Sequence, residues 1–192
     1  MTSSEDSLHE QRVDLSQYST GGYDPGPTWK RGLWILISGM FFEVFFPWPS
    51  AMKAAILRAF GASVGDDVVI KPQVKIKYPW FLEIGDYSWI GEWAWIDNVA
   101  AVTLLDNVVI SQGAHLLTGN HDYKSSRFEL IAQPIRVETS GWVAARAVVG
   151  PGVTIGELAV LTAGSVAGKD LAARGIYRGN PAVLLRERVL ES

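Results

Sequence analysis

The chain carries a small or branched apolar residue at every sixth position over much of its length. After residue 136 the positions are Val137, Val143, Val149, Ile155, Leu161 and Ala167. A period of six is neither the 3.6 of a helix nor the alternation of a half-buried strand. It is typical of the solenoids called hexapeptide β-helices. In such a fold each six residues form one short strand and a corner, and three strands close one coil.

The same phase extends back to residue 64. Its earlier positions come in triplets with two extra residues between them: Val64, Ile70, Ile76; Ile84, Ile90, Ile96; Leu104, Ile110, Leu116. A long interruption, residues 118–135, separates these triplets from Val137. At three positions a coil, the pattern predicts an all-β parallel β-helix of about five coils, with the extra residues in surface corners.

The flanking sequences divide the chain into four parts. We expect an N-terminal arm over residues 1–30, an apolar helical segment over 31–62, the β-helix over 63–170 and a C-terminal loop and short helix over 171–192. The first part is rich in Ser, Gly and Pro, which favours either a partly ordered tail or an arm that wraps a neighbouring subunit. The last part would cap the open strand edge of the final coil.

The apolar segment leaves three interpretations open. Between Gly32 and Trp48 the only charged residue is Glu43. As a helix this run is packed on the β-helix or on another subunit, lies in a membrane interface with Trp34 and Trp48 as anchors, or spans a bilayer. A second short helix is expected from Ser50, the N-cap, to Phe60.

Composition narrows the possible chemistry. The chain contains no cysteine, which excludes disulfides and thiol nucleophiles, and its formal charge of −3 argues against nucleic acid as a partner. The polar N-terminus lacks the pattern of a secretory signal, so we expect a cytoplasmic protein, either free or associated with the inner face of the membrane.

Several motifs resemble one enzyme family. They are WIDN (95–98), ISQGAHLLTGNHD (110–122), PGVTIG (151–156), AGSV (163–166), KD (169–170) and GNPA (179–182). Together with the phase, they resemble the hexapeptide-repeat sugar O-acetyltransferases, and among these the colanic acid biosynthesis acetyltransferases. The resemblance implies a left-handed parallel β-helix, a homotrimer, acetyl-CoA as co-substrate and no metal.

The resemblance also implies a catalytic residue. His121, in the TGNHD motif at the start of the long interruption, matches the family's histidine that deprotonates the acceptor hydroxyl. An imidazole suits that task because its ordinary pKa lies near neutrality. The hydroxyl oxygen then attacks the thioester directly. His115 precedes the inward Leu116, and we expect a structural role for it.

Matching positions give candidate binding residues. For the acceptor they are Asp97, Asn98, Asn120, Asp122 and Trp142. For acetyl-CoA they are Trp142, small residues that let the pantetheine chain approach the backbone, and two cations for its phosphates: Ala145, Ala163, Gly164, Lys169 and Arg186. Gly168 stands where many members of the family have a threonine, so one hydroxyl contact is missing.

Other functions stay open at this point. The favoured one is acetyl transfer to a sugar hydroxyl, on a small or lipid-linked saccharide such as an exopolysaccharide precursor. The acceptor is alternatively an antibiotic, a serine or an amino sugar. A non-catalytic scaffold or a carbonic anhydrase of the same fold is a further alternative, although only His115 and His121 lie in the β-helix to ligate a metal.

Overall fold

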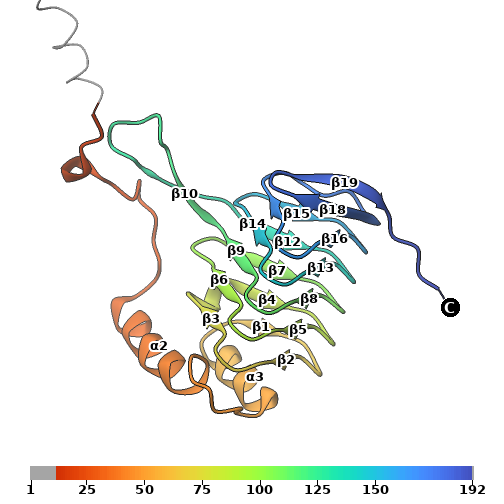
Figure 1. The fold of residues 1–192 in the computed structure, drawn as a ribbon. Coiled ribbons are helices and arrows are strands. Elements are labelled where there is room, and N and C mark those ends of the chain that lie inside the picture. The colour runs from red at the N-terminus through yellow and green to blue at the C-terminus, as the bar shows by residue number, and fades with distance from the viewer. Residues whose placement is uncertain (1–11, 192) are drawn as a thin grey trace, which may run out of the picture.

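The six-residue pattern forms three parallel sheets in the computed structural model, which describes residues 12–191 (Figure 1). The first eleven residues of the expected N-terminal arm therefore lie outside the described residues. The fold is a left-handed parallel β-helix, as predicted. Its coils stack as a triangular prism, with one strand on each of three faces in every coil.

Each sheet takes one strand from each coil. The first sheet contains β1 (Ser63–Val64), β4 (Leu82–Ile84), β7 (Val102–Leu104), β12 (Ile135–Val137) and β15 (Thr154–Ile155). The second contains β2 (Val69–Ile70), β5 (Trp89–Ile90), β8 (Val109–Ile110), β13 (Trp142–Val143), β16 (Val160–Leu161), β18 (Gly175–Gly179) and β19 (Ala182–Glu187). The third contains β3 (Lys75–Ile76), β6 (Trp95–Asp97), β9 (His115–Leu117), β14 (Val148–Val149) and β17 (Val166–Ala167).

The residues at every sixth position form the core. All fifteen positions from Val64 to Ala167 are buried, and none is more than 8% exposed. Strand pairs keep them in register, so Ile84 stacks on Val64 and Val137 on Leu104. The phase in the sequence therefore specifies both the strands and their stacking.

The prism continues further than expected, into a partial sixth coil. Leu171 is buried and bridges to Ile155 on the first sheet, and Tyr177 pairs with Leu161 on the second. The six-residue phase does end there, because the step from Ala167 to Leu171 is four residues and Ala173 is exposed, but the coils continue past residue 170.

The short C-terminal helix that the sequence predicted is also wrong. Residues Ala182–Glu187 form β19, which pairs antiparallel with β18 (Figure 1). The open edge of β18 offers backbone groups that a strand can satisfy and a helix cannot. A helix would also need a surface on which to bury its apolar face, whereas Val183, Leu184 and Leu185 are exposed.

Two helices precede the prism, as expected. They are α2 (Thr28–Phe41) and α3 (Ser50–Ala59). Among residues 12–191, no helix is both long enough and apolar enough to cross a membrane. Short 3₁₀ turns lie in the arm, η1 (Leu15–Gln17), and before β4, η2 (Pro79–Phe81). The predicted N-cap is wrong, because Ser50 is the first helical residue and its hydroxyl accepts a hydrogen bond from the Ile70 N–H at 3.0 Å instead.

The helices cover the open end of the first coil. In later coils the strand carbonyls accept hydrogen bonds from the N–H groups of the coil before, and the first coil has no such neighbour. Side chains of α2 and α3 donate to its carbonyls instead: Arg58 to Val64 at 2.8 Å, Lys53 to Lys71 at 2.9 Å and Trp34 to Ile76 at 2.8 Å. One donor thus serves the first strand of each sheet. The helical segment packs on the prism through these bonds and through the buried Trp34, Phe42 and Leu57.

The three corners of the prism differ. At two of them, the third residue after each inward residue has a positive φ, as in Asp67, Tyr87 and Asn107 on one corner and Gln73 and Trp93 on the other. These left-handed residues close tight corners of constant length. The corner between the third and first sheets has such a residue, Gly152, after Val149, where no residues are inserted. In the earlier coils this corner carries every insertion of the pattern.

Candidate active site

The long interruption is a β-hairpin that leaves the prism at the corner between the third and first sheets. Its strands are β10 (Gly119–His121) and β11 (Leu130–Ala132), which pair antiparallel with His121 opposite Leu130 (Figure 1). The hairpin follows β9 in the third coil and returns to β12 in the fourth. His121 therefore lies on an ordered strand rather than on an irregular loop.

The hydrogen bond of the His121 ring defines its chemistry. Nδ1 lies 3.0 Å from the carbonyl oxygen of Phe128, and the two rings stack with 4.3 Å between centroids and 6° between planes. A carbonyl oxygen only accepts hydrogen bonds, so Nδ1 carries the proton and donates. Nε2 then keeps its lone pair and can accept a proton from a substrate. The ring is in the tautomer that a general base requires.

Asn120 and Asp122 do not hold the imidazole. The Asn120 side-chain oxygen accepts from the His121 N–H at 2.8 Å, and the Asp122 carboxylate accepts from the Lys124 N–H at 3.0 Å. Both side chains therefore shape the hairpin backbone. Neither is buried, so the expectation that they contact an acceptor stays a prediction.

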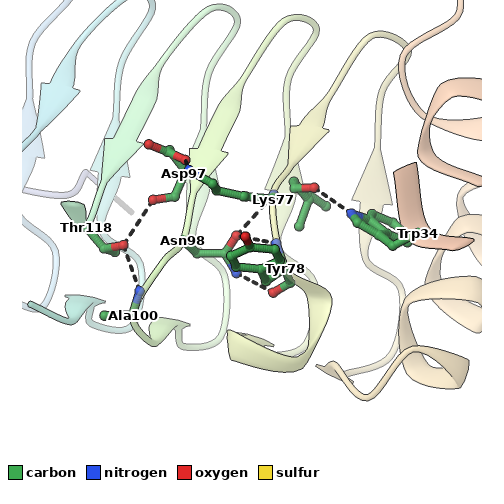
Figure 2. A network of polar contacts seen from close by, with 8 residues as sticks. Trp34, Lys77, Tyr78, Asp97, Asn98, Ala100 and Thr118 are labelled. Atoms are coloured by element: carbon green, nitrogen blue, oxygen red, sulfur yellow. Dashed lines mark hydrogen bonds and ion pairs between the residues drawn. The ribbon is translucent and has the colours of Figure 1, made fainter. Parts of the chain in front are cut away.

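Asp97 and Asn98 lie at the same corner, one coil below the hairpin. Figure 2 shows Asp97 paired with Lys77, whose Nζ lies 2.8 Å from its carboxylate. The Thr118 hydroxyl donates to the Asp97 carbonyl at 3.0 Å and accepts from the Ala100 N–H at 2.9 Å. These bonds fix the base of the hairpin next to Asp97.

Asn98 has an internal role. Its side chain is fully buried, its oxygen accepts from the N–H groups of Lys77 and Tyr78, and its amide donates to the Tyr78 carbonyl at 2.6 Å (Figure 2). All three bonds go to the backbone of the coil below. The structure therefore gives Asn98 the task of holding Lys77 and Tyr78 in place.

A cavity of about 370 Å³ lies between α2 and the third sheet. Its walls combine the apolar Trp34, Ile35, Ile76 and Trp95 with the polar groups of Arg31, Ser38, Glu43, Lys75, Lys77, Tyr78 and Asp97. The size and the mixture suit a small ligand with several polar groups. Of these residues the sequence singled out only Asp97 as a candidate ligand contact. Lys77 could have been predicted from the sequence. It follows the inward Ile76 in the first coil, as Asp97 follows the inward Ile96 in the second.

The N-terminal arm runs from α2 to the hairpin (Figure 1). The Asp14 N–H donates to the Ser126 carbonyl at 2.8 Å, and the ring of Tyr18 lies 5.8 Å from that of His121. The arm was expected to be a tail or to wrap a neighbour, and over residues 12–27 it contacts its own chain. No hydrophobic period marks these residues, so this contact could not be predicted from the sequence.

Most of the acetyl-CoA candidates lie elsewhere on the prism. Trp142 is on the second sheet, where its Nε1–H donates to the Ser111 hydroxyl at 2.9 Å. Ala145, Ala163 and Gly164 follow at the corner between the second and third sheets, with the Gly164 N–H donating to the Ala145 carbonyl at 2.9 Å. A Cβ at Gly164 would meet no atom within 4 Å, so a ligand can reach the backbone there.

The two candidates for binding the phosphates, Lys169 and Arg186, lie at other places on the prism than Ala145, Ala163 and Gly164. Lys169 is exposed at the corner between the third and first sheets, two coils beyond the hairpin. Arg186 is exposed on β19, opposite Ile176. The structure thus brings together Trp142, Ala145, Ala163 and Gly164, and separates this group from His121 within one chain.

His115 lies outside the hairpin. Its ring meets Trp95 edge to face at 5.5 Å, beside a surface hollow that Trp93 and Arg146 also line. Within residues 12–191 no group of three or more His, Asp or Glu side chains is placed to hold a metal ion.

Comparison with known proteins identifies relatives. No family model matches the chain. An Escherichia coli K12 protein named colanic acid biosynthesis acetyltransferase WcaF is 41% identical over 92% of this chain and 97% of its own length. A solved galactoside acetyltransferase in complex with coenzyme A is 26% identical, with a TM-score of 0.75 over 82% of this chain and 80% of that one. A Vibrio cholerae hexapeptide-repeat acetyltransferase complexed with acetyl-coenzyme A has a TM-score of 0.78 at 24% identity, over 90% and 96% of the two chains.

Proposed function

The chain belongs to the hexapeptide-repeat acetyltransferases, and on that premise we propose that it transfers an acetyl group from acetyl-CoA to a saccharide hydroxyl with His121 as general base. The family decides against the scaffold and carbonic anhydrase alternatives, because its members transfer acetyl groups. The observation that carries the role of His121 is its bond from Nδ1 to the Phe128 carbonyl, which leaves Nε2 able to accept a proton.

The reaction needs two proton transfers, one to His121 from the acceptor and one from His121 to the leaving thiolate. Nε2 of His121 takes the proton of the acceptor hydroxyl while the oxygen attacks the thioester carbonyl carbon. The C–O ester bond forms, the C–S bond breaks, and the thiolate of coenzyme A leaves and takes the proton back from His121. The chain has no cysteine, which agrees with direct transfer rather than a thiol-bound intermediate.

Acetyl-CoA supplies the activated acetyl group, and the chain offers residues that fit it. The open backbone at Gly164 and the small side chains of Ala145 and Ala163 allow close approach of a pantetheine chain. We assign the phosphates to Lys169 and Arg186, both exposed cations. Trp142 offers an exposed aromatic face on the second sheet.

The acceptor we propose is an exopolysaccharide precursor, bound in the cavity between α2 and the third sheet. The name of the E. coli relative, which places that protein in colanic acid biosynthesis, supports this choice. The ion pair of Asp97 and Lys77 in the cavity wall supports it too, because paired charges bind sugar hydroxyls as both donor and acceptor. An antibiotic, a serine or an amino sugar is the alternative acceptor.

A homotrimer is part of the proposal. His121 and the group around Gly164 lie at different corners of one prism, and a neighbouring prism can bring them together. Light scattering should give three times the chain mass of 21.0 kDa. A fully active particle of one chain mass would contradict this.

We also place the enzyme at the inner face of the membrane, where a lipid-linked acceptor would be found. One face of α2 carries Trp29, Leu33, Leu36 and Met40, all exposed, and Phe45 and Phe46 extend it beyond the helix. Trp34, by contrast, is buried against the prism and cannot serve as an anchor.

The decisive experiment compares the two histidines. His121→Ala should lower kcat by about 10²–10⁴-fold, the usual contribution of a general base, with acetyl-CoA affinity little changed. Lys169→Ala should do the reverse, weakening coenzyme A binding while kcat at saturation is largely kept. Release of coenzyme A thiol is measured with D-glucose, D-galactose, maltose and D-glucuronic acid as acceptors, and with serine and glucosamine for the alternative.

His115→Ala is the matched control, since that imidazole is also partly buried but lies outside the hairpin. If His121→Ala keeps more than about a tenth of native kcat while a still-folded His115→Ala loses about a thousandfold, the wrong histidine has been chosen.

A further inference from the structure

Buried polar atoms without hydrogen-bond partners gather beside the cavity. Within residues 12–191 they belong to Tyr23 (the hydroxyl), Arg31 (Nε), Trp80 (Nε1) and Asp97 (Oδ1), and of these only the Asp97 oxygen has an ion-pair partner, Lys77. Buried polar groups in proteins are nearly always paired, so the three atoms of Tyr23, Arg31 and Trp80 that have neither a hydrogen bond nor an ion pair require an explanation. A bound ligand is one that the position supplies.

The four residues come from separate elements. Tyr23 is on the arm, Arg31 on α2, Trp80 in η2 and Asp97 at the end of β6. Arg31 and Asp97 line the cavity, and Tyr78, which also lines it, stacks on Trp80 at 5.1 Å. Gly26 of the arm approaches the Trp80 indole, which fixes the arm beside this wall.

Of the three cationic side chains that line the cavity, only Arg31 has no acidic partner among the described residues. Lys77 pairs with Asp97 at 2.8 Å and Lys75 approaches Glu43 at 3.9 Å. Arg31 forms no ion pair within the described residues, and its one side-chain hydrogen bond goes to the Thr28 hydroxyl. Its Nε–H is therefore a buried donor with a full positive charge behind it.

Tyr23 stays in its protonated form. Burial, and then the nearby Tyr78 and Asp97, raise the pKa of its hydroxyl well above the ordinary value. The group can therefore donate one hydrogen bond and accept others at every physiological pH. A sugar hydroxyl has the same double capacity and is a matching partner.

We propose that Tyr23 and Arg31 bind oxygen atoms of the acceptor, so that the N-terminal arm completes the acceptor site and contributes to its specificity. The inference rests on the proposed function, in which this cavity holds a saccharide. Tyr23 binds a hydroxyl of the sugar, and Arg31 binds an adjacent oxygen. Both act as specificity-determining residues, and neither takes part in proton transfer.

The test is Tyr23→Phe, which removes one oxygen atom and keeps the ring. We expect the KM for the best acceptor of the panel to rise about threefold to tenfold, as for one lost hydrogen bond. The KM for acetyl-CoA and the kcat at saturation should stay within about twofold. Arg31→Gln should raise the acceptor KM more, by about tenfold to a hundredfold, because its bond is charge-assisted.

The melting temperature separates a ligand contact from a structural one. The Tyr23 hydroxyl has no hydrogen-bond partner among residues 12–191, so Tyr23→Phe should melt at the native temperature or slightly above it. Tyr87→Phe, at an exposed corner residue far from the cavity, is the matched control and should change neither KM nor melting temperature. An unchanged acceptor KM, or a melting temperature several degrees lower with the KM unchanged, would overturn the inference.

Separate measurements test the proposed function and the role of Tyr23. If no sugar of the panel accepts an acetyl group, the proposed function fails. Calorimetric titration of D-galactose and maltose into native and Tyr23→Phe protein then decides the inference alone. Equal binding by both proteins, or no binding by either, would end it, and weaker binding by the variant would support it.

Discussion

At the scale of single residues, Asn98 supports the wall of the cavity without lining it. Its side-chain amide adds three hydrogen bonds to the backbone of Lys77 and Tyr78, which line the cavity, and it directly follows Asp97. The side chain is buried beside an apolar core, where lost hydrogen bonds are not replaced by water. The wall of the proposed acceptor site thus depends on a residue that is itself fully buried.

Asn98→Ala should therefore destabilise the protein as well as the site. It removes three hydrogen bonds and leaves the Tyr78 N–H unpaired, while the Lys77 N–H keeps the Ile96 carbonyl and the Tyr78 carbonyl keeps the Phe81 N–H. We expect a loss of about 2–4 kcal/mol of unfolding free energy. Urea unfolding at one fixed protein concentration measures it. Gln112→Ala, which removes an exposed amide, should stay within about 0.5 kcal/mol. Equal midpoints for the two variants would show that the bonds of Asn98 contribute nothing.

At the scale of elements, α3 supplies hydrogen-bond donors to the first coil, as a neighbouring strand would. Lys53 is fully buried, and its ammonium group donates to the carbonyls of Ile70 at 3.3 Å and Lys71 at 2.9 Å. Burial lowers the pKa of Lys53 below its ordinary value. The helix thus satisfies the edge of β2 at the cost of a charged group out of water.

This pKa predicts a stability that depends on pH. Because the folded pKa lies below the unfolded one, the unfolded chain binds more protons between the two values. The penalty for burying the charge is complete below the folded pKa, and it disappears as pH rises toward the unfolded pKa of about 10.4. Native protein should therefore gain stability relative to Lys53→Met as pH rises from 7 to 10.

Urea midpoints at pH 7, 8.5 and 10 measure this difference. Ser50→Ala is the control, since Ser50 contacts the same strand end through the Ile70 N–H but carries no charge. Its effect should be the same at each pH. A constant difference between native protein and Lys53→Met over this range would rule out the titration of Lys53 as the cause.

The same scale shows what the sequence could and could not predict. The inward residues from Val64 to Ala167 were predicted because one apolar residue every six is required by the crowded axis of the prism. β19 was missed, because its pairing depends on the open edge of β18 and not on its own periodicity. His121 was found through its motif, whereas Tyr23 and Arg31 are brought to the cavity by tertiary contacts that leave no local pattern.

At the scale of the whole molecule, an apolar surface on α2 is left uncovered by the described residues, 12–191. It follows α2 through Trp29, Leu33, Leu36 and Met40 and continues to Phe45 and Phe46, the last two 78% and 58% exposed. These positions are spaced so that they share one side of the helix. Aromatic and aliphatic side chains on such a face are typical of helices that lie in a membrane interface.

Leu36→Ser combined with Phe45→Ser and Phe46→Ser should abolish binding to vesicles without unfolding the protein. Phe42 is left intact because it is fully buried against the prism. Flotation with phosphatidylglycerol vesicles is the measurement, and circular dichroism confirms the fold. Native protein that stays at the bottom of the gradient would refute the membrane contact, and a loss of trimers in the variant would assign the surface to subunit contacts instead.

The donors that α2 and α3 place on the first coil have a consequence for polymerisation. A stack of identical coils has no inherent length, and each terminal strand is a template on which another chain can grow. Arg58, Lys53 and Trp34 occupy that template at one end, and β19 occupies the second sheet at the other. A chain that lost its helices would expose the starting edges of all three sheets at once, and would join end to end into filaments where the intact protein stops at six coils.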